Sequence, residues 1–407
     1  MTGFDAVAAR LDAEDPLARF RDRFLPSPGV VAYLDGNSLG RPPIVTAERL
    51  DRFVREQWAG RLIRGWGESW MGWPEEVGDR VAAAALGAAP GQTVVADSTT
   101  VLLYKLARAA VDHQYPARRE IVLCSDDFPT DRYVVEGIAA ERGARLVWVE
   151  TDPAAGITPA QVAAVVGPET ALVLLSHVAY RSGWVADAEA ITALVHDAGA
   201  LVLWDLSHSV GSVELELDAW GVDLAVGCTY KYLNGGPGSP AFAYVRRGLH
   251  DRLRQPIQGW MGRRDPFEMG PGYTPAAGVR GIVSGTPPIL ATVPLLAGLD
   301  MLSEAGIGAV RTKSRALTAF ALDLVDAWLP DVEVVSPRDP DRRGGHLTIR
   351  RAGFREVLDA LWDAGVLPDY REPDGIRIGL APLSTGFTEV HDGLSVLREL
   401  LVSRMAG

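Results

Sequence analysis

Seven short apolar segments between residues 93 and 245 constrain the fold most. Several of them are separated by stretches in which apolar residues recur at helical spacing. The apolar segments are 93–97, 120–124, 145–150, 171–176, 201–205, 224–228 and 241–245, and the helical segments are 99–112, 129–142 and 187–199. Strands that are apolar throughout and alternate with helices are typical of parallel sheets buried on both faces. We therefore predict an α/β fold with a mostly parallel seven-stranded sheet flanked by helices.

The rest of the chain predicts a second, smaller domain. A Gly- and Pro-rich stretch at 259–288 indicates loops, and a long helix follows at 289–328, with a break near Gly306. Two apolar strands and two helices between 346 and 401 predict a small α+β domain. We expect three parts: an N-terminal segment that packs on the small domain (1–60), a large domain (61–290) and a small C-terminal domain (291–407).

Lysine usage singles out Lys231. The chain has 37 arginines and only three lysines, and Lys231 lies in GCTYKYLNGGPGSP, directly after a predicted strand. A guanidinium does not lose its proton in proteins, whereas an amine can. A lysine at this position, in a chain that otherwise uses arginine, therefore indicates chemistry that needs a free amine. The other two lysines, Lys105 and Lys313, lie within helical patterns and are expected to be solvated or to extend along apolar surface.

Polar and aromatic residues follow the other predicted strands. Asp205 and His208 come after one strand, Phe128 and Asp131 after another, and the run 98–100 (Ser-Thr-Thr) after a third. In a parallel sheet these ends gather at one edge, where ligands bind. Plain interpretations stay open: a helix N-cap for the Ser-Thr-Thr run, a turn residue at Asp205, a core position for Phe128 and an ordinary buried histidine at His208.

One cofactor accounts for all of these groups. Pyridoxal phosphate requires an anion site such as a helix N-terminus, an aromatic ring to stack on, an acid for its pyridine nitrogen and a lysine for its aldehyde. The glycines after Lys231 allow the backbone to approach such a cofactor closely. The sequence therefore predicts a pyridoxal phosphate enzyme.

Several sequence blocks resemble those of kynureninase, a pyridoxal phosphate enzyme of fold type I. The blocks are YLDGNSLGRPP (33–43), DDFPTDRYV (126–134), the stretch 204–245, SGTPPIL (284–290) and GIRIGLAPL (375–383). They occur in the same order as in that family and cover nearly the whole chain. The Asp-x-x-His pattern and the strand-end lysine are shared with cysteine desulfurases and class V aminotransferases.

The resemblance implies a role for each matching residue. Lys231 forms the Schiff base, Asp205 faces the pyridine nitrogen, and Tyr230 is the candidate proton donor. The other implied cofactor contacts are Thr99, Thr100, Phe128, Asp131, Ser176, His208, Trp260 and, across a dimer, Thr286. The implied substrate contacts are Arg377, which clamps the α-carboxylate, Trp66 in the aryl pocket, and Asn37. The plain alternatives are a surface ion pair for Arg377 and a core position for Trp66.

The implied reaction is hydrolysis of L-kynurenine, with 3-hydroxykynurenine as a possible second substrate, to anthranilate and L-alanine by Cβ–Cγ cleavage in tryptophan catabolism. Two alternatives stay open: a cysteine desulfurase or selenocysteine lyase on the same fold, and a kynureninase homologue that acts on a modified kynurenine in secondary metabolism. A desulfurase needs a cysteine on a mobile loop, whereas Cys124 and Cys228 both lie at the ends of apolar strands.

The composition of the chain argues against several classes of binding partner. A net charge of −12 argues against nucleic acid, including a DNA-binding regulator on this fold, and against anionic membranes. Two cysteines are too few for a disulfide framework or a zinc site, and we expect no metal. No leader pattern and no apolar run of about 18–20 residues is visible. We expect a cytoplasmic homodimer that shares its active sites and acts on a small amino-acid substrate.

Overall fold

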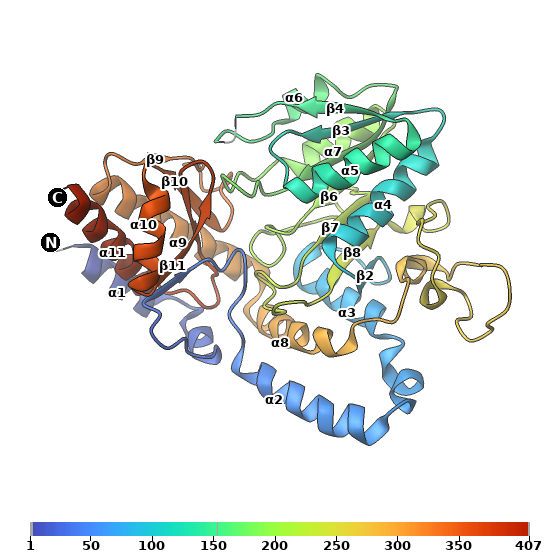
Figure 1. Ribbon diagram of the computed structural model, residues 1–407, viewed down its shortest axis with the longest axis horizontal. Helices are drawn as coiled ribbons and strands as arrows, with labels where there is room; N and C mark the ends of the chain where they lie inside the picture. The colour runs from blue at the N-terminus through green and yellow to red at the C-terminus, as the bar shows by residue number, and fades with distance from the viewer. Residues whose placement is uncertain (1–2, 153, 406–407) are drawn as a thin grey trace.

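The computed structural model describes residues 3–152 and 154–405. The first two residues of the predicted N-terminal segment and the last two of the predicted C-terminal domain lie outside the described residues. The described part contains a seven-stranded sheet and a five-stranded sheet, which occupy different regions of the molecule (Figure 1).

The large sheet confirms the predicted α/β fold. Its strands are β2 (Thr93–Ala96), β3 (Glu120–Cys124), β4 (Arg145–Val149), β5 (Thr170–Ser176), β6 (Leu201–Asp205), β7 (Leu224–Gly227) and β8 (Ala241–Val245). They lie in the order β2-β8-β7-β6-β5-β3-β4, and β8 alone runs antiparallel to its neighbours. The carboxyl ends of the other six strands therefore meet at one edge.

Helices cover both faces of this sheet because its strands are apolar on both faces. Alternate residues of β3 face opposite sides: Ile121 packs with α4 (Thr99–Gln114) and α5 (Pro129–Arg142), and Val122 with α7 (Ala188–Asp197). The other α-helices and π-helical turns of the large region are α3 (Trp73–Val81), α6 (Pro159–Ala163), Phe53–Ala59, Trp66–Trp70 and Ala82–Leu86; the 3-10 turns of the described chain are Ala18–Arg23, Arg247–Leu249, Trp260–Gly262 and Gly278–Ile282.

The small sheet combines both ends of the chain. It contains β1 (Ala32–Leu34), β9 (Glu333–Val334), β10 (His346–Arg350), β11 (Val366–Arg371) and β12 (Gly375–Gly379), in the order β1-β11-β12-β10-β9. The helices of this region are α1 (Phe4–Glu14), α9 (Ile307–Trp328), α10 (Phe354–Asp363) and α11 (Phe387–Met405). Figure 1 shows α1 beside α11, and β1 pairs with β11 in parallel, so the N-terminal segment begins on the small sheet.

A connecting region joins the two sheets. The helix α2 (Ile44–Arg52) packs on α8 (Ile289–Ala305), and Gly306, whose φ of 78° suits a glycine, separates α8 from α9 at the predicted break. The domain boundaries at residues 60 and 290 stay predictions. Among the described helices, none is by itself long and apolar enough to cross a membrane; the α8–α9 pair, which bends by 87°, passes that test only as a pair.

Candidate active site

Lys231 and His208 form the centre of the site. Lys231 follows β7 and His208 follows β6, and the Lys231 Nζ lies 3.0 Å from the His208 Nε2. Both side chains are buried. Burial lowers the pKa of Lys231, and burial together with the Lys231 charge lowers the pKa of His208 well below its ordinary value. The site therefore favours an uncharged imidazole and a more readily deprotonated amine.

Acidic residues surround this pair. Asp205 ends β6, and its Oδ1 accepts hydrogen bonds from the Ser207 backbone N (2.9 Å) and Oγ (2.6 Å). Ser176 lies opposite Asp205 in the neighbouring strand β5. Asp131 is buried near the start of α5, and its Oδ2 has no hydrogen-bond partner among the described residues. Burial and the Asp205 charge raise the pKa of Asp131 well above its usual range.

Asp127 is a structural acid that no feature of the sequence indicates. Its two carboxylate oxygens accept hydrogen bonds from the backbone N–H groups of Cys124 and Ser176, both at 2.8 Å, so it joins the ends of β3 and β5. Burial raises the pKa of Asp127 to about 7. Its importance comes from a contact between two strands, which the local sequence does not reveal.

The start of α4 offers an anion site. Ser98 is the N-cap, and its Oγ accepts a hydrogen bond from the Val101 N (3.4 Å), so the N-cap interpretation of this residue is confirmed. The N–H groups of Thr99 and Thr100, in the first turn, lack intrahelical partners. Thr100 is exposed and Thr99 is half-buried. A phosphate can bind there, because these N–H groups and the helix dipole attract anions.

Two aromatic side chains lie at the same edge. Phe128 precedes α5, is 37% exposed, and meets the Tyr180 ring edge-on at 5.4 Å, so it does not have a core position. The Tyr230 ring is half-buried, and the Lys231 Nζ lies 6.0 Å from its centroid. Burial raises the pKa of Tyr230, which keeps its hydroxyl protonated.

Arg377 is deeply buried, so its interpretation as a surface residue is wrong. Only 1% of its side chain is exposed on β12, and its guanidinium contacts Asp369 (2.7 Å), Ser38 Oγ (2.5 Å) and the Tyr180 carbonyl (2.8 Å). The arginine faces inward because the loop after β1 and the segment after β5 cover β12. Asn37, with its amide oriented to satisfy both neighbours, accepts a hydrogen bond from the Arg377 Nε at 2.9 Å.

The loop that carries Asn37 packs directly on the lysine turn. The Gly40 N donates to the Tyr230 carbonyl (2.8 Å), and a side chain at Gly40 would overlap the Lys231 carbonyl oxygen. His346, at the start of β10, completes this side, with its ring centroid 5.7 Å from that of His208. Tyr180 and His346 were both missed, because their relevance comes from packing; the one sequence signal for Tyr180 was its position shortly after Ser176.

Three predicted site residues lie apart from this group. Trp260 is 38% exposed in a segment with Phe267, and Thr286 is exposed before α8. Trp66 is half-buried and meets Trp70 edge-on at 5.4 Å. Among the described residues of one subunit, none of these three makes a hydrogen bond or ring contact with Lys231, and their roles stay predictions.

The prediction that Lys105 and Lys313 are solvated or extend along apolar surface to reach water is wrong. Both are buried in ion pairs, Lys105 with Asp97 (2.5 Å) and Lys313 with Asp15 (2.7 Å). Each lysine sits on the inward face of its helix, where an acid from another segment meets it. All three lysines are therefore buried.

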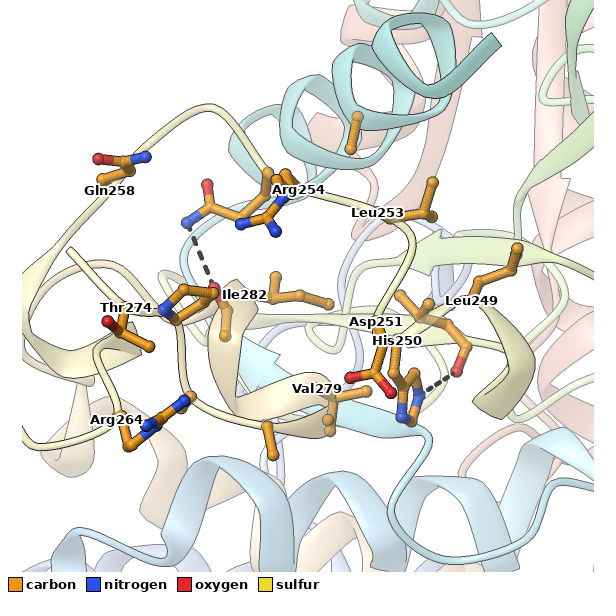
Figure 2. Close-up of a pocket in the computed structure, with 18 of the residues that line it drawn as sticks. Leu249, His250, Asp251, Leu253, Arg254, Gln258, Arg264, Thr274, Val279 and Ile282 are labelled. Atoms are coloured by element: carbon orange, nitrogen blue, oxygen red, sulfur yellow. Dashed lines mark hydrogen bonds between the residues drawn. The ribbon is translucent and has the colours of Figure 1, made fainter.

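A cavity of about 760 Å³ lies against α4 (Figure 2). Residues from the stretches 249–258 and 273–282 line it, together with Leu106 and Ala109 of α4. The lining includes Ile282, Arg254 and Arg264 but none of the group around Lys231. In the described ranges, no cluster of three or more His, Cys, Asp or Glu side chains could hold a metal ion.

Comparisons with known proteins show the family to which the chain belongs. The sequence model of the family described as "Aminotransferase class-V" matches residues 67–362. A kynureninase from Pseudomonas fluorescens is 41% identical over 96% of this chain and 94% of its own length. One from Burkholderia pseudomallei is 40% identical over 97% and 94%.

Solved structures show the same fold. A cysteine desulfurase from Thermococcus onnurineus superimposes with a TM-score of 0.84 at 20% identity and covers 95% of this chain and 98% of its own. One from Escherichia coli has a TM-score of 0.82 at 18% identity, with the same coverage. At this level of identity the likeness concerns the fold alone.

Proposed function

The chain belongs to the kynureninase family, within the class-V aminotransferases, and on that premise we propose that it hydrolyses L-kynurenine to anthranilate and L-alanine with pyridoxal phosphate as cofactor. The observation that carries the proposal is the buried contact between Lys231 and His208 at the edge where Asp205 ends β6. The full-length identity to kynureninases supports the substrate class.

The residues at this edge fit pyridoxal phosphate. Free N–H groups at the start of α4 suit its phosphate, the half-exposed ring of Phe128 suits its pyridine face, and Asp205 suits its ring nitrogen. The Oδ2 of buried Asp131 has no hydrogen-bond partner in the part of the chain that the structure describes, which leaves an acceptor for a polar group of the ligand. When bound, the cofactor withdraws electrons from the bonds around the α- and β-carbons of an attached amino acid.

Lys231 is the proposed base. Burial lowers its pKa, so its Nζ can accept a proton from the substrate α-carbon near neutral pH. His208 stays neutral and can accept a hydrogen bond from the Nζ, which orients the amine. Both side chains are shielded from bulk water, which protects a transferred proton from exchange.

Tyr230 is the proposed proton donor. Water adds to the γ-carbonyl of the substrate, and breaking the Cβ–Cγ bond then releases anthranilate and leaves electrons on the β-carbon. The β-carbon must receive a proton before alanine is released. Burial raises the pKa of the Tyr230 hydroxyl, so the group retains a proton to give, and its ring lies 6.0 Å from the Lys231 Nζ.

Arg377 is the proposed anchor for the substrate carboxylate. Its planar guanidinium can bind a carboxylate through two parallel hydrogen bonds when the carboxylate displaces Ser38 or Asp369 from the Nη2, and Asn37 fixes its orientation through the Nε. Asp369 occupies one side of the guanidinium and also pairs with Arg371 at 2.8 Å, and Asp35 lies 3.8 Å from the Arg377 Nη2. Two arginines therefore meet two acids here, and the proposed carboxylate site depends on the geometry of the guanidinium and not on an excess of positive charge.

We further propose a cytoplasmic homodimer in which Thr286 and Trp260 complete the phosphate site. Both lie in the stretch 260–286, whose exposed side chains also include Phe267 and Met269. Exposed apolar side chains of this kind are typical of interfaces. Both cysteines are free, which suits a reducing compartment.

A side-by-side product assay tests the proposal. Purified protein is incubated with L-kynurenine, 3-hydroxykynurenine and L-cysteine, and anthranilates, alanine and sulfide are quantified. We expect anthranilate and alanine, with kcat/KM roughly ten- to a hundredfold higher for kynurenine, because Trp66 would crowd a 3-hydroxyl without a hydrogen bond. Sulfide release from cysteine without anthranilate would favour a desulfurase, and turnover of neither kynurenine would favour a modified substrate.

The desulfurase alternative meets a physical obstacle. Cys124 and Cys228 are both buried, and burial raises the pKa of Cys124 to about 12. A sulfur acceptor must be a reachable thiolate. Neither cysteine meets that condition.

A further inference from the structure

Lys105 is a buried lysine that the proposed reaction does not use. Its side chain is fully buried on α4, and its Nζ donates to the Asp97 Oδ2 at 2.5 Å and to the Ile282 carbonyl at 2.7 Å. Burying an ammonium group is costly unless it is paired and hydrogen-bonded. Because the chain has only three lysines, we expect this buried lysine to have a specific structural role.

The first partner, Asp97, lies directly before the anion site. It joins β2 to the N-cap Ser98, and its φ of 44° is unusual for a residue with a side chain. Its carbonyl accepts a hydrogen bond from the Ala241 N at 3.0 Å. Asp97 is thus held at its side chain by Lys105 and at its backbone by β8. Together these contacts fix the direction in which the N–H groups of Thr99 and Thr100 point.

The second partner, Ile282, ends the turn Gly278–Ile282 and lies four residues before Thr286. Figure 2 shows Ile282 on the wall of the cavity beside α4. A single ammonium group therefore connects the turn before α4 to the segment that leads to Thr286. Both are segments to which we assign contacts with the cofactor phosphate.

We propose that Lys105 is a positioning residue that fixes the turn 97–100 in the geometry that binds the phosphate of the cofactor. The inference rests on the proposed function, because it assumes a phosphate at the start of α4. It assigns Lys105 no contact with substrate or cofactor. Its effect is on recognition of the phosphate, through Asp97.

The chain offers a matched control in Lys313. Its side chain is 3% exposed, and its Nζ lies 2.7 Å from the Oδ2 of Asp15, which is also buried. Lys105→Met and Lys313→Met each remove a buried lysine from an ion pair. Because Asp15 is buried whereas the Asp97 side chain is 29% exposed, the general loss of stability should be at least as large in Lys313→Met. Only Lys105 is joined to the anion site.

The test compares pyridoxal phosphate with pyridoxal, which lacks the phosphate. Dissociation constants for both are measured by absorbance titration of the cofactor-free full-length protein, for wild type and the two variants. For Lys105→Met we expect the dissociation constant of pyridoxal phosphate to rise roughly 10- to 100-fold, which corresponds to the loss of a charged hydrogen bond. The dissociation constant of pyridoxal should change less than about threefold. Lys313→Met should lower the melting temperature and leave both constants within about twofold.

Three results would overturn the inference: an equal loss of affinity for both compounds in Lys105→Met, an unchanged constant for pyridoxal phosphate in that variant, or an equal loss in Lys313→Met. If Lys105→Met does not fold, Asp97→Asn replaces it and should show the same selective loss, of roughly 3- to 10-fold; wild-type affinity in that variant contradicts the inference. Failure of the wild type to bind pyridoxal phosphate would instead refute the proposed function itself.

Discussion

Burial at the sheet edge displaces the pKa values of the residues that would move protons. It lowers the pKa of Lys231 and His208 and raises that of Tyr230 and Asp131. Each displacement favours the uncharged form of its group. An amine that can accept a proton and a hydroxyl that retains one therefore occur side by side near neutral pH.

Asp205→Asn should retain the cofactor and lose most activity. An amide keeps the size of the side chain but cannot stabilise a protonated ring nitrogen. We expect kcat to fall by about 10²- to 10⁴-fold, while the visible absorbance of bound cofactor persists. Asp326→Asn, which removes one partner of the exposed pair with Arg338, is the control. Activity of Asp205→Asn within a few-fold of wild type would refute the role of this carboxylate.

Arg377→Lys should raise KM by roughly 10- to 100-fold. A lysine supplies a point charge without the planar fork that binds a carboxylate through two hydrogen bonds. Steady-state kinetics check this, with Arg350→Lys as the matched control, because Arg350 lies on the adjacent strand β10 with 44% of its side chain exposed. If both variants keep the wild-type KM, Arg377 serves the packing of the small sheet and not the substrate.

The elements differ in how far the sequence predicts them. The strands of the large sheet were predicted because they are apolar throughout, and every residue of β3, β5 and β6 is buried. The strand β11 was missed because Pro368, Asp369 and Arg371 interrupt its pattern, and it is half-exposed. The strand β1 has only three residues and exists through its pairing with β11. Pairing between distant segments leaves no local signal.

The same limit applies to the site. Lys231 was recognisable from residue usage, and Asp205 and Phe128 from their positions after strands. Asp127 and Tyr180 were not, because their roles come from hydrogen bonds and ring contacts between elements. The burial of Lys105 likewise depends on an acid and a carbonyl from two other segments.

The loop 35–40 should tolerate no side chain at Gly40. A methyl group there would overlap the carbonyl oxygen of Lys231, which is part of a fixed turn. We expect Gly40→Ala to lower the free energy of unfolding by about 2 kcal/mol and to reduce cofactor occupancy. In Gly137→Ala, a control in the exposed middle of α5 with no atom in the way, stability should rise by about 0.5–1 kcal/mol. Denaturant titration of both variants tests these expectations. If Gly40→Ala were as stable as the wild type, the result would contradict the packing of this loop on the lysine turn.

At the scale of the whole molecule, the two sheets supply different halves of the site. The large sheet places Lys231, His208 and Asp205 at its edge, and the small sheet places Arg377 and His346 against them. The loop after β1 joins the halves, since Asn37 contacts Arg377 and Gly40 contacts the lysine turn. This arrangement is the basis for our proposal that the substrate binds between the two sheets.

The attachment point of the cofactor tests the central claim most directly. The protein is incubated with pyridoxal phosphate, reduced with borohydride, digested and analysed by mass spectrometry. With three lysines in the chain, the possible sites are few. We predict that the pyridoxyl group is found on Lys231 and that Lys105 and Lys313, both buried in ion pairs, remain unmodified. A pyridoxyl group on Lys105 or Lys313, or on no lysine, would contradict the account.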